Sequence, residues 1–173
     1  AASGECLHTF VGHKDLVSSA AFSPDGRAVL TASQDHTAKL WCADSGKCLR
    51  TLKGHAGAVT SAAFSPDGRT VLTASKDHKT KLWCAVSGKC LHTLQGHTDA
   101  VASAAFSPDG RQVLTASWDL TSKLWCAASG ELLRALEGHT NFVESAAFSP
   151  DGLRVVSASW DRTAKIWCAA SGE

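Results

Sequence analysis

The chain has 173 residues and a net charge of +1, and 44% of its residues are hydrophobic and 19% are charged. This composition excludes a disordered chain and gives no excess of positive charge for binding nucleic acid. No apolar run approaches the roughly 20 residues that cross a membrane, so we expect a compact protein that binds neither nucleic acid nor a membrane.

The start of the chain carries no visible targeting segment, neither a signal peptide nor a transit peptide, so a cytoplasmic location is expected. The sequence contains no methionine, even at position 1. We therefore interpret it as a processed product, an excised domain or a designed protein.

Three motifs recur along the chain with a constant step of 42 residues. Ser-Ala-Ala-Phe-Ser-Pro-Asp-Gly occupies residues 19–26, 61–68, 103–110 and 145–152; Gly-His occupies 12–13, 54–55, 96–97 and 138–139; Lys-(Leu/Ile)-Trp-Cys occupies 39–42, 81–84, 123–126 and 165–168. A period of 20–50 residues is typical of solenoids, propellers and arrays. We expect one domain over residues 1–173, with units of about 5–46, 47–88, 89–130 and 131–173.

Each unit is predicted to form four short strands, which in the first unit span residues 17–22, 28–33, 37–42 and 48–52. Ser-Pro-Asp-Gly lies between the first two strands, where proline and glycine suit a tight turn. Strands of five or six residues separated by turn signals indicate an antiparallel meander. Residues 5–10 match the fourth strand of later units, so we expect a lone strand there, and the last unit ends after its third strand.

The combination of Gly-His, Ser-Pro-Asp-Gly, Ser-x-Asp and a strand-ending Trp occurs four times in register over the whole chain and resembles the WD-repeat family. This resemblance implies an all-β fold, a WD-type β-propeller with four blades per chain. One departure is constant, because Cys follows the Trp in every unit (Cys42, Cys84, Cys126 and Cys168) where the family usually has Asp. The departure puts in doubt a turn contact made by that Asp, but not the fold.

Each unit also holds a His, a Thr or Ser, and an Asp at fixed spacing. Such a set suits a nucleophile, its base and the group that orients the base. The resemblance implies instead a structural hydrogen-bond tetrad with the strand Trp, and four equivalent copies favour this reading because an enzyme needs only one such site. We expect no catalytic residue and no cofactor. The tetrads are His13, Thr31, Asp35 and Trp41; His55, Thr73, Asp77 and Trp83; His97, Thr115, Asp119 and Trp125; and His139, Ser157, Asp161 and Trp167.

The seven cysteines allow two interpretations. Cys42 and Cys48 flank one predicted turn, as do Cys84 and Cys90, so cross-strand disulfides are geometrically conceivable. Leu132 stands in the equivalent position of the fourth unit, which favours free, buried thiols. The C-x₅-C spacing lacks the close pairing of a zinc site, and no metal is expected.

Variation between the units concentrates in two loops. The residue before the tetrad Asp is Gln34, Lys76, Trp118 or Trp160; the residue three positions after the tetrad His is Leu16, Ala58, Ala100 or Phe142; and Ser18, Thr60, Ala102 or Glu144 lies two positions further on. In the WD-repeat family these loops share the top face, which commonly binds partners. Trp118, Phe142 and Trp160 are therefore predicted to anchor a protein or peptide. The alternative is that each Trp packs on its neighbour's loop at the seam between blades.

Ring closure leads to a prediction about assembly. Four blades would each span about 90°, whereas two chains would give eight blades at about 45° each. We expect an eight-bladed, strand-exchanged homodimer in which each N-terminal strand completes the partner's last sheet. A closed four-bladed monomer and a fragment of a longer propeller are the alternatives. The expected function is a non-catalytic protein-interaction scaffold, and the alternative is a designed or excised module that assembles only with itself.

Overall fold

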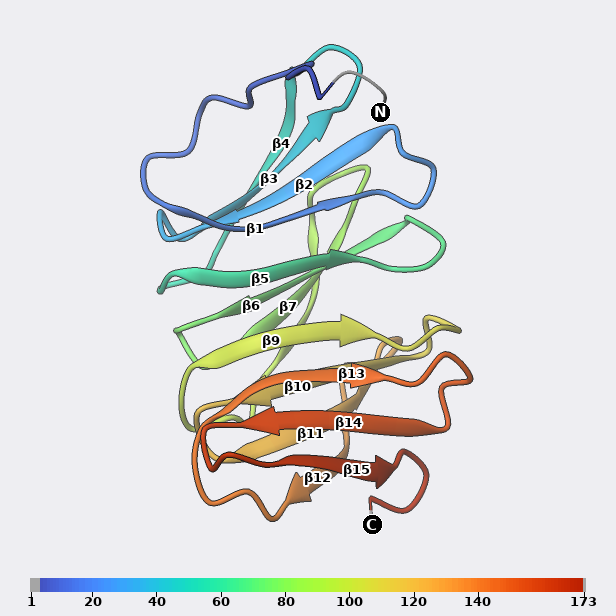
Figure 1. Cartoon of the computed structure of the whole chain (residues 1–173). Helices are drawn as coiled ribbons and strands as arrows, with labels where there is room; N and C mark the ends of the chain where they lie inside the picture. Colours follow the sequence, from blue (N-terminus) through green and yellow to red (C-terminus); the bar gives the residue numbers. More distant parts are fainter. Residues whose placement is uncertain (1–3, 173) are drawn as a thin grey trace.

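The computed structural model describes residues 4–172, which form β-strands joined by turns. The strands are β1 (Val17–Phe22), β2 (Ala28–Ser33), β3 (Thr37–Cys42), β4 (Cys48–Lys53), β5 (Val59–Phe64), β6 (Thr70–Ser75), β7 (Thr80–Cys84), β8 (Cys90–Leu94), β9 (Val101–Phe106), β10 (Gln112–Ser117), β11 (Thr121–Cys126), β12 (Leu132–Glu137), β13 (Val143–Phe148), β14 (Arg154–Ser159) and β15 (Ala164–Cys168). Figure 1 shows four antiparallel sheets, β1–β4, β5–β8, β9–β12 and β13–β15, each with its strands in chain order. Residues 4–172 contain no helix, and therefore none long and apolar enough to cross a membrane.

The Ser-Pro-Asp-Gly turn joins the first two strands of every sheet through the same contacts. In the first sheet, Ser23 Oγ accepts a hydrogen bond from the Ala28 N–H at 2.9 Å and donates one to Asp25 Oδ1 at 2.6 Å. Gly26 has a φ of 72°, a left-handed value that glycine adopts without strain. Equivalent contacts recur at Ser65, Ser107 and Ser149. The turn thus begins and ends these strands at the predicted residues.

Neighbouring sheets pack face to face through one recurring set of apolar side chains. Between the first two sheets, Leu40 and Leu52 cluster with Val71 and Trp83. The equivalent sets are Leu82, Leu94, Val113 and Trp125 at the second seam, and Leu124, Leu136, Val155 and Trp167 at the third. Since burial of a large apolar side chain contributes about 1.5–3 kcal/mol, these seams carry most of the hydrophobic stabilisation of the stack.

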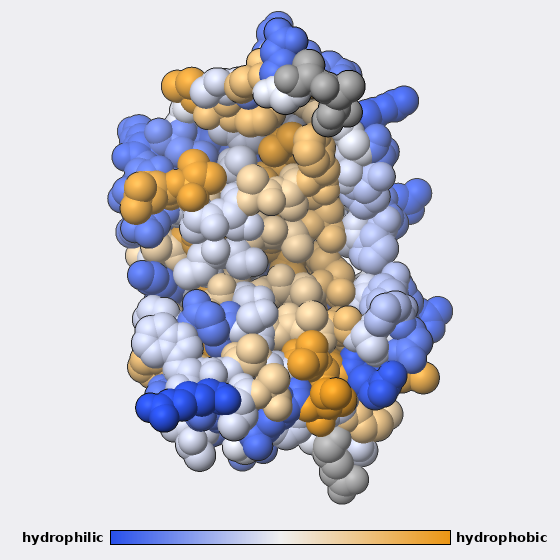
Figure 2. Space-filling model, viewed as in Figure 1, coloured by the Kyte–Doolittle hydropathy of each residue, from blue (hydrophilic) through white to orange (hydrophobic). Residues whose placement is uncertain are grey.

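The first strands of the four sheets, β1, β5, β9 and β13, lie side by side along one side of the stack (Figure 1). Each carries an Ala-Ala pair in its second half. Figure 2 shows the result as a continuous band of mildly apolar surface running along this side. Small side chains let the first strands approach closely, as the crowded inner wall of a propeller requires.

The N-terminal segment differs from the prediction. Residues 5–10 were expected to form a strand, but they form none. They lie beside the first sheet, where His8 Nε2 is 2.8 Å from the Asp44 carbonyl oxygen and the Phe10 ring packs on Trp41 with centroids 5.5 Å apart. A strand needs a hydrogen-bonded neighbour, and β15, the edge that this segment was expected to extend, lies at the opposite end of the stack (Figure 1). The fourth sheet consequently has three strands.

Candidate functional site

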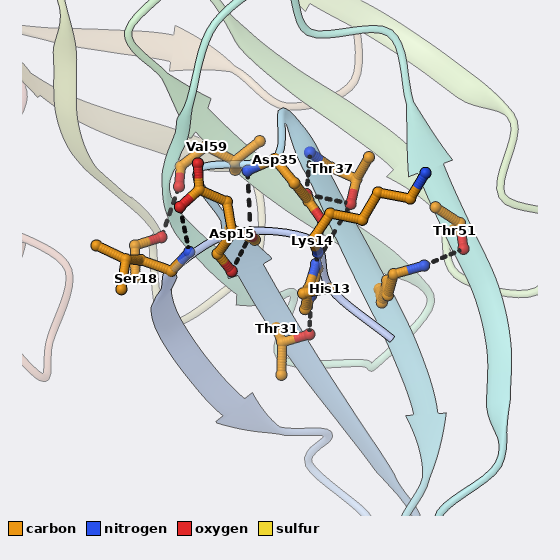
Figure 3. Close-up of polar contacts among 12 residues, drawn as sticks. His13, Lys14, Asp15, Ser18, Thr31, Asp35, Thr37, Thr51 and Val59 are labelled. Carbon is orange, nitrogen blue, oxygen red and sulfur yellow. Dashed lines mark hydrogen bonds and ion pairs between the residues drawn. The ribbon is translucent and has the colours of Figure 1, made fainter. Parts of the chain in front are cut away.

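The tetrad of the first unit ties its two top loops to the sheet below them (Figure 3). His13 Nδ1 is 2.9 Å from Asp35 Oδ2, and His13 Nε2 is 2.7 Å from Thr31 Oγ1. The Trp41 indole N–H donates to the same Thr31 oxygen at 2.8 Å. Asp35 also accepts a hydrogen bond from the Lys14 N–H at 2.9 Å, which links the Gly-His loop to the turn between β2 and β3.

The same network occurs in all four units. The distance from His Nδ1 to the Asp carboxylate is between 2.6 and 2.9 Å, and the distance from the indole nitrogen to the hydroxyl oxygen is 2.8 or 2.9 Å. Ser157 replaces Thr in the fourth unit and keeps both contacts, with His139 and with Trp167. A β-branched methyl group is therefore not needed for the network.

Hydrogen bonds and burial together set the charges in the tetrads. Burial opposes ionisation of Asp77, but hydrogen bonds from the Ala56 N–H and from His55 outweigh it and hold the pKa of this carboxyl below its usual value. Burial lowers the pKa of His55, so the imidazole is neutral at pH 7. Its Nδ1–H then faces the carboxylate and Nε2 accepts the hydroxyl proton of Thr73. The pKa values of Asp35, Asp119 and Asp161 are lowered as well, because hydrogen bonds outweigh burial there too.

This geometry suits support rather than chemistry. The hydroxyl of Thr31 is engaged by both an imidazole and an indole, and Thr31 is only 5% exposed. A nucleophile needs an open approach to its oxygen, which these contacts occupy. Satisfied buried networks of this kind fix one geometry. The tetrads therefore position the loops above them.

The top loops are held in place by one backbone hydrogen bond in each unit. The Gln34 N–H donates to the Leu16 carbonyl at 2.9 Å, and the Trp160 N–H donates to the Phe142 carbonyl at the same distance. Lys76 and Trp118 make the equivalent bonds to Ala58 and Ala100. Each variable residue before the tetrad Asp thus lies beside the variable residue of the Gly-His loop in its own unit.

Four of the predicted partner-binding residues form a continuous row across three sheets. The Lys76 ammonium group lies 5.7 Å from the centre of the Trp118 ring. Trp118 stacks on Phe142 with centroids 5.3 Å apart, and Phe142 meets Trp160 at 5.6 Å. Glu144 accepts a hydrogen bond from the Trp118 indole at 3.2 Å. Because Trp118 and Phe142 belong to neighbouring sheets, the stacking contact between their rings lies across the seam between those sheets.

Gln34 and Leu16 lie apart from this row, in the first unit at the other end of the stack. Leu16 is 67% exposed and Trp160 is 59% exposed, whereas Trp118 is half-buried by its neighbours. The contact between Lys76 and Trp118 was not predicted, although their 42-residue separation places them in equivalent positions of adjacent units. That separation was the signal that could have identified the pair.

Two hydroxyls near the top face bridge the blades. Ser18 Oγ donates to the Val59 carbonyl at 2.5 Å (Figure 3), and Thr60 Oγ1 donates to the Val101 carbonyl at 2.6 Å. Ala102 holds the equivalent position of the third unit and has no hydroxyl to donate. These two positions therefore support the seams. None of the seven cysteines forms a disulfide within residues 4–172, and their side chains are exposed or half-buried rather than buried as expected.

Comparison with known proteins agrees with this architecture. The sequence model described as WD domain, G-beta repeat matches residues 4–42, 46–84, 88–126 and 130–168. A 42-residue stretch is 45% identical to the protein named transcriptional repressor tup12 from Schizosaccharomyces pombe, and it covers 24% of this chain. The match spans only 7% of that protein's length. Because the repeat model matches four segments that together span most of the sequence, the chain belongs to the WD40 repeat family.

Proposed function

We propose that the chain is a non-catalytic scaffold whose top face binds a protein or peptide segment. The observation that carries this function is the row of Lys76, Trp118, Phe142 and Trp160 on otherwise matched units. Trp160 is exposed and Trp118 and Phe142 are half-buried, and rigidly held aromatic side chains that reach the surface are typical binding hot spots. The row offers flat apolar rings flanked by one ammonium group and the Glu144 carboxylate, a surface that suits an extended segment with aromatic or long apolar side chains.

The proposal also covers the class of partner and the cellular compartment. A net charge of +1 supports the expectation that neither nucleic acid nor a membrane is the partner. The cytoplasm is one compartment in which this scaffold is proposed to act. The relative that matches one unit is named a transcriptional repressor, which adds the nucleus as a compartment where this scaffold would act.

A displayed library of linear peptides tests the binding function. The parent protein should enrich peptides that share an aromatic or long apolar anchor, and the double variant Trp118→Ala plus Trp160→Ala should lose this enrichment. The matched control is Val86→Ala plus Leu153→Ala, because these side chains are also exposed, at 77% and 68%, but lie in turns away from the top loops. Equal enrichment by the parent and the double tryptophan variant would refute the site.

We also infer that the scaffold is an eight-bladed ring made by two copies of the chain. Support comes from the open stack, whose ends lie apart (Figure 1), and from the three-stranded last sheet. Light scattering on a size-exclusion column should give about twice the chain mass of 18.1 kDa. A mass near 18.1 kDa would instead favour a closed four-bladed ring or a fragment. A module that only assembles with itself would form the ring and enrich no peptide.

A further inference from the structure

The last sheet presents a seam surface that has no neighbour. Ile166 of β15 is 69% exposed. At the same position of the other three sheets the residue is at most 3% exposed (Leu40, Leu82 and Leu124) because the next sheet covers it. Val156 of β14 is 42% exposed, although its equivalents are fully buried. The outer face of the last sheet thus repeats an internal seam face that lacks its cover.

The first sheet presents the complementary surface. Val17 is 53% exposed, whereas the equivalent Val59, Val101 and Val143 are 0% exposed. Phe22 is 69% exposed, and its equivalents in the later sheets are half-buried. In each internal seam these positions receive the leucines of the preceding sheet. The end face of the first sheet is therefore complementary to the end face of the last sheet. The packing would be the same as at the three internal seams.

The N-terminal segment, residues 5–10, packs on the first sheet as the fourth strand of each four-stranded sheet packs on the sheet that follows it. His8 packs against Gly46 as His92 packs against Gly130 and Arg134 against Gly172. Phe10 packs on Trp41, and residue 10 is equivalent to Leu52, Leu94 and Leu136, which pack in the same way on the Trp of the next sheet. The segment is therefore held on the first sheet without any strand of its own sheet beside it.

An open pocket lies beneath this segment. Its volume is about 810 Å³, and its lining includes Leu7, Phe10, Phe22, Val29 and Ala43. The corresponding spaces at the first and second internal seams have one further wall, formed by Leu40 and Leu82 of the preceding sheet. Ile166 is the residue of the last sheet that holds the position of those leucines. The pocket and the exposed isoleucine are thus two halves of one contact.

Building on the scaffold proposed above, we propose that these end faces dock on a second copy of this chain, head to tail and twice around a twofold axis. Residues 5–10 of the partner extend β15 as its fourth strand, and Ile166 enters the pocket beneath the partner's Phe10. Both ends of each chain are then covered, which leaves no sheet edge open at the seams. Two identical seams close the assembly, so it does not grow into a filament.

The second copy also completes the binding surface on the top face. Trp118 stacks on Phe142 of the next sheet, and Trp160 holds the equivalent position at the end of the stack. In the closed ring, Trp160 therefore lies on the partner's Leu16, the residue equivalent to Phe142. The aromatic row then continues from one chain to the next, and each of two opposite sites takes residues from both copies.

Two aspartate variants test this seam. Ile166→Asp and Val17→Asp should each reduce the mass from about twice 18.1 kDa to 18.1 kDa, because each places a charge in both seams of the ring. The matched control is Leu153→Asp. Leu153 lies in the turn that precedes β14 and is 68% exposed, close to the exposure of Ile166, but its equivalents are arginines in the other units. This control should keep the mass of the dimer.

A mixture of the two variants separates docking from misfolding. One intact seam remains in the mixed pair, formed by Val17 of one chain and Ile166 of the other, so mixing should restore a species of about twice 18.1 kDa. A monomeric parent, a larger open assembly, a dimeric Ile166→Asp variant or a mixture that stays monomeric would each overturn the seam. Peptide enrichment is read separately, so loss of binding with an intact dimer would refute the scaffold function alone.

Discussion

At the scale of single residues, the carboxylate of Asp77 joins its tetrad to the backbone of the adjoining loop. It accepts hydrogen bonds from His55 and from the Ala56 N–H at 2.8 and 2.9 Å. Asp77→Ala should lower the free energy of unfolding by about 1–3 kcal/mol, because the buried His55 imidazole loses its acceptor. Urea denaturation measures the change. Asp44→Ala, in an exposed turn, is the control and should change it by less than about 0.5 kcal/mol.

Ser122 is a buried residue whose hydroxyl is not satisfied by a hydrogen bond. Its hydroxyl has no hydrogen-bond partner among residues 4–172, and alanine holds the equivalent position in the first and fourth units (Ala38 and Ala164). Ser122→Ala should raise the free energy of unfolding by about 1 kcal/mol, since the variant no longer desolvates an unpaired hydroxyl. Ser117→Ala should lower it, because that buried hydroxyl donates to the Ala100 carbonyl at 2.9 Å. If both variants were destabilised equally, the hydroxyl of Ser122 would have a partner in solution.

The tetrad histidine also makes stability depend on pH. Burial holds the pKa of His55 below its ordinary value, so between the two values the unfolded chain binds a proton that the folded chain does not. The free energy of unfolding is therefore highest above about pH 6.5, and it falls as the pH decreases below that value. The lowered pKa of Asp77 adds a further loss below about pH 4. Thermal unfolding at pH 7.5 and 5.5 should show the lower midpoint at pH 5.5, and equal midpoints would contradict a neutral buried imidazole.

At the scale of elements, the turn between the second and third strands stores strain. The residue after the tetrad Asp is left-handed in every unit, and in the third unit it is Leu120 with a φ of 72°. A left-handed residue other than glycine costs about 1–2 kcal/mol. Leu120→Gly should therefore stabilise the protein by about 0.5–1 kcal/mol after the entropy of glycine in the unfolded chain is subtracted. Leu120→Ala removes the same side chain without relieving the backbone, so a gain equal to that of glycine would refute the strain.

Strand positions were predictable where turn chemistry marks them. Ser23-Pro24-Asp25-Gly26 defines both adjacent strands, because its hydrogen bonds close the loop locally. The fourth strand runs one residue beyond the prediction, to Lys53, since pairing with Thr37 extends it. Residues 5–10 have the sequence of a fourth strand but no strand to pair with in this chain. The local sequence therefore predicts which segments are able to form a strand. Whether a segment forms one depends on the presence of a neighbouring strand to pair with.

At the scale of the whole molecule, the repeat predicts each seam but not the number of blades. Leu40 and Trp83 pack across a seam in the same way whatever the ring size, and the angle between sheets depends on small rotations summed over many contacts. In the candidate site, too, the repeat predicts some features and the angle between sheets determines others. The 42-residue period places Lys76 next to Trp118 in adjacent units, whereas the approach of the ammonium group to within 5.7 Å of the ring centre depends on the angle between two sheets.

Assembly from two copies has a thermodynamic signature that does not depend on mass. If two chains unfold from one ring, a hundredfold increase in protein concentration stabilises the folded state by about 2.7 kcal/mol. For two chains of this length the midpoint of thermal unfolding should rise by about 4 °C, which differential scanning calorimetry resolves. The Ile166→Asp variant should show no such rise, because its charged end face keeps the chains separate. A midpoint of the parent that stays constant over this range would mean that each chain closes or stands alone.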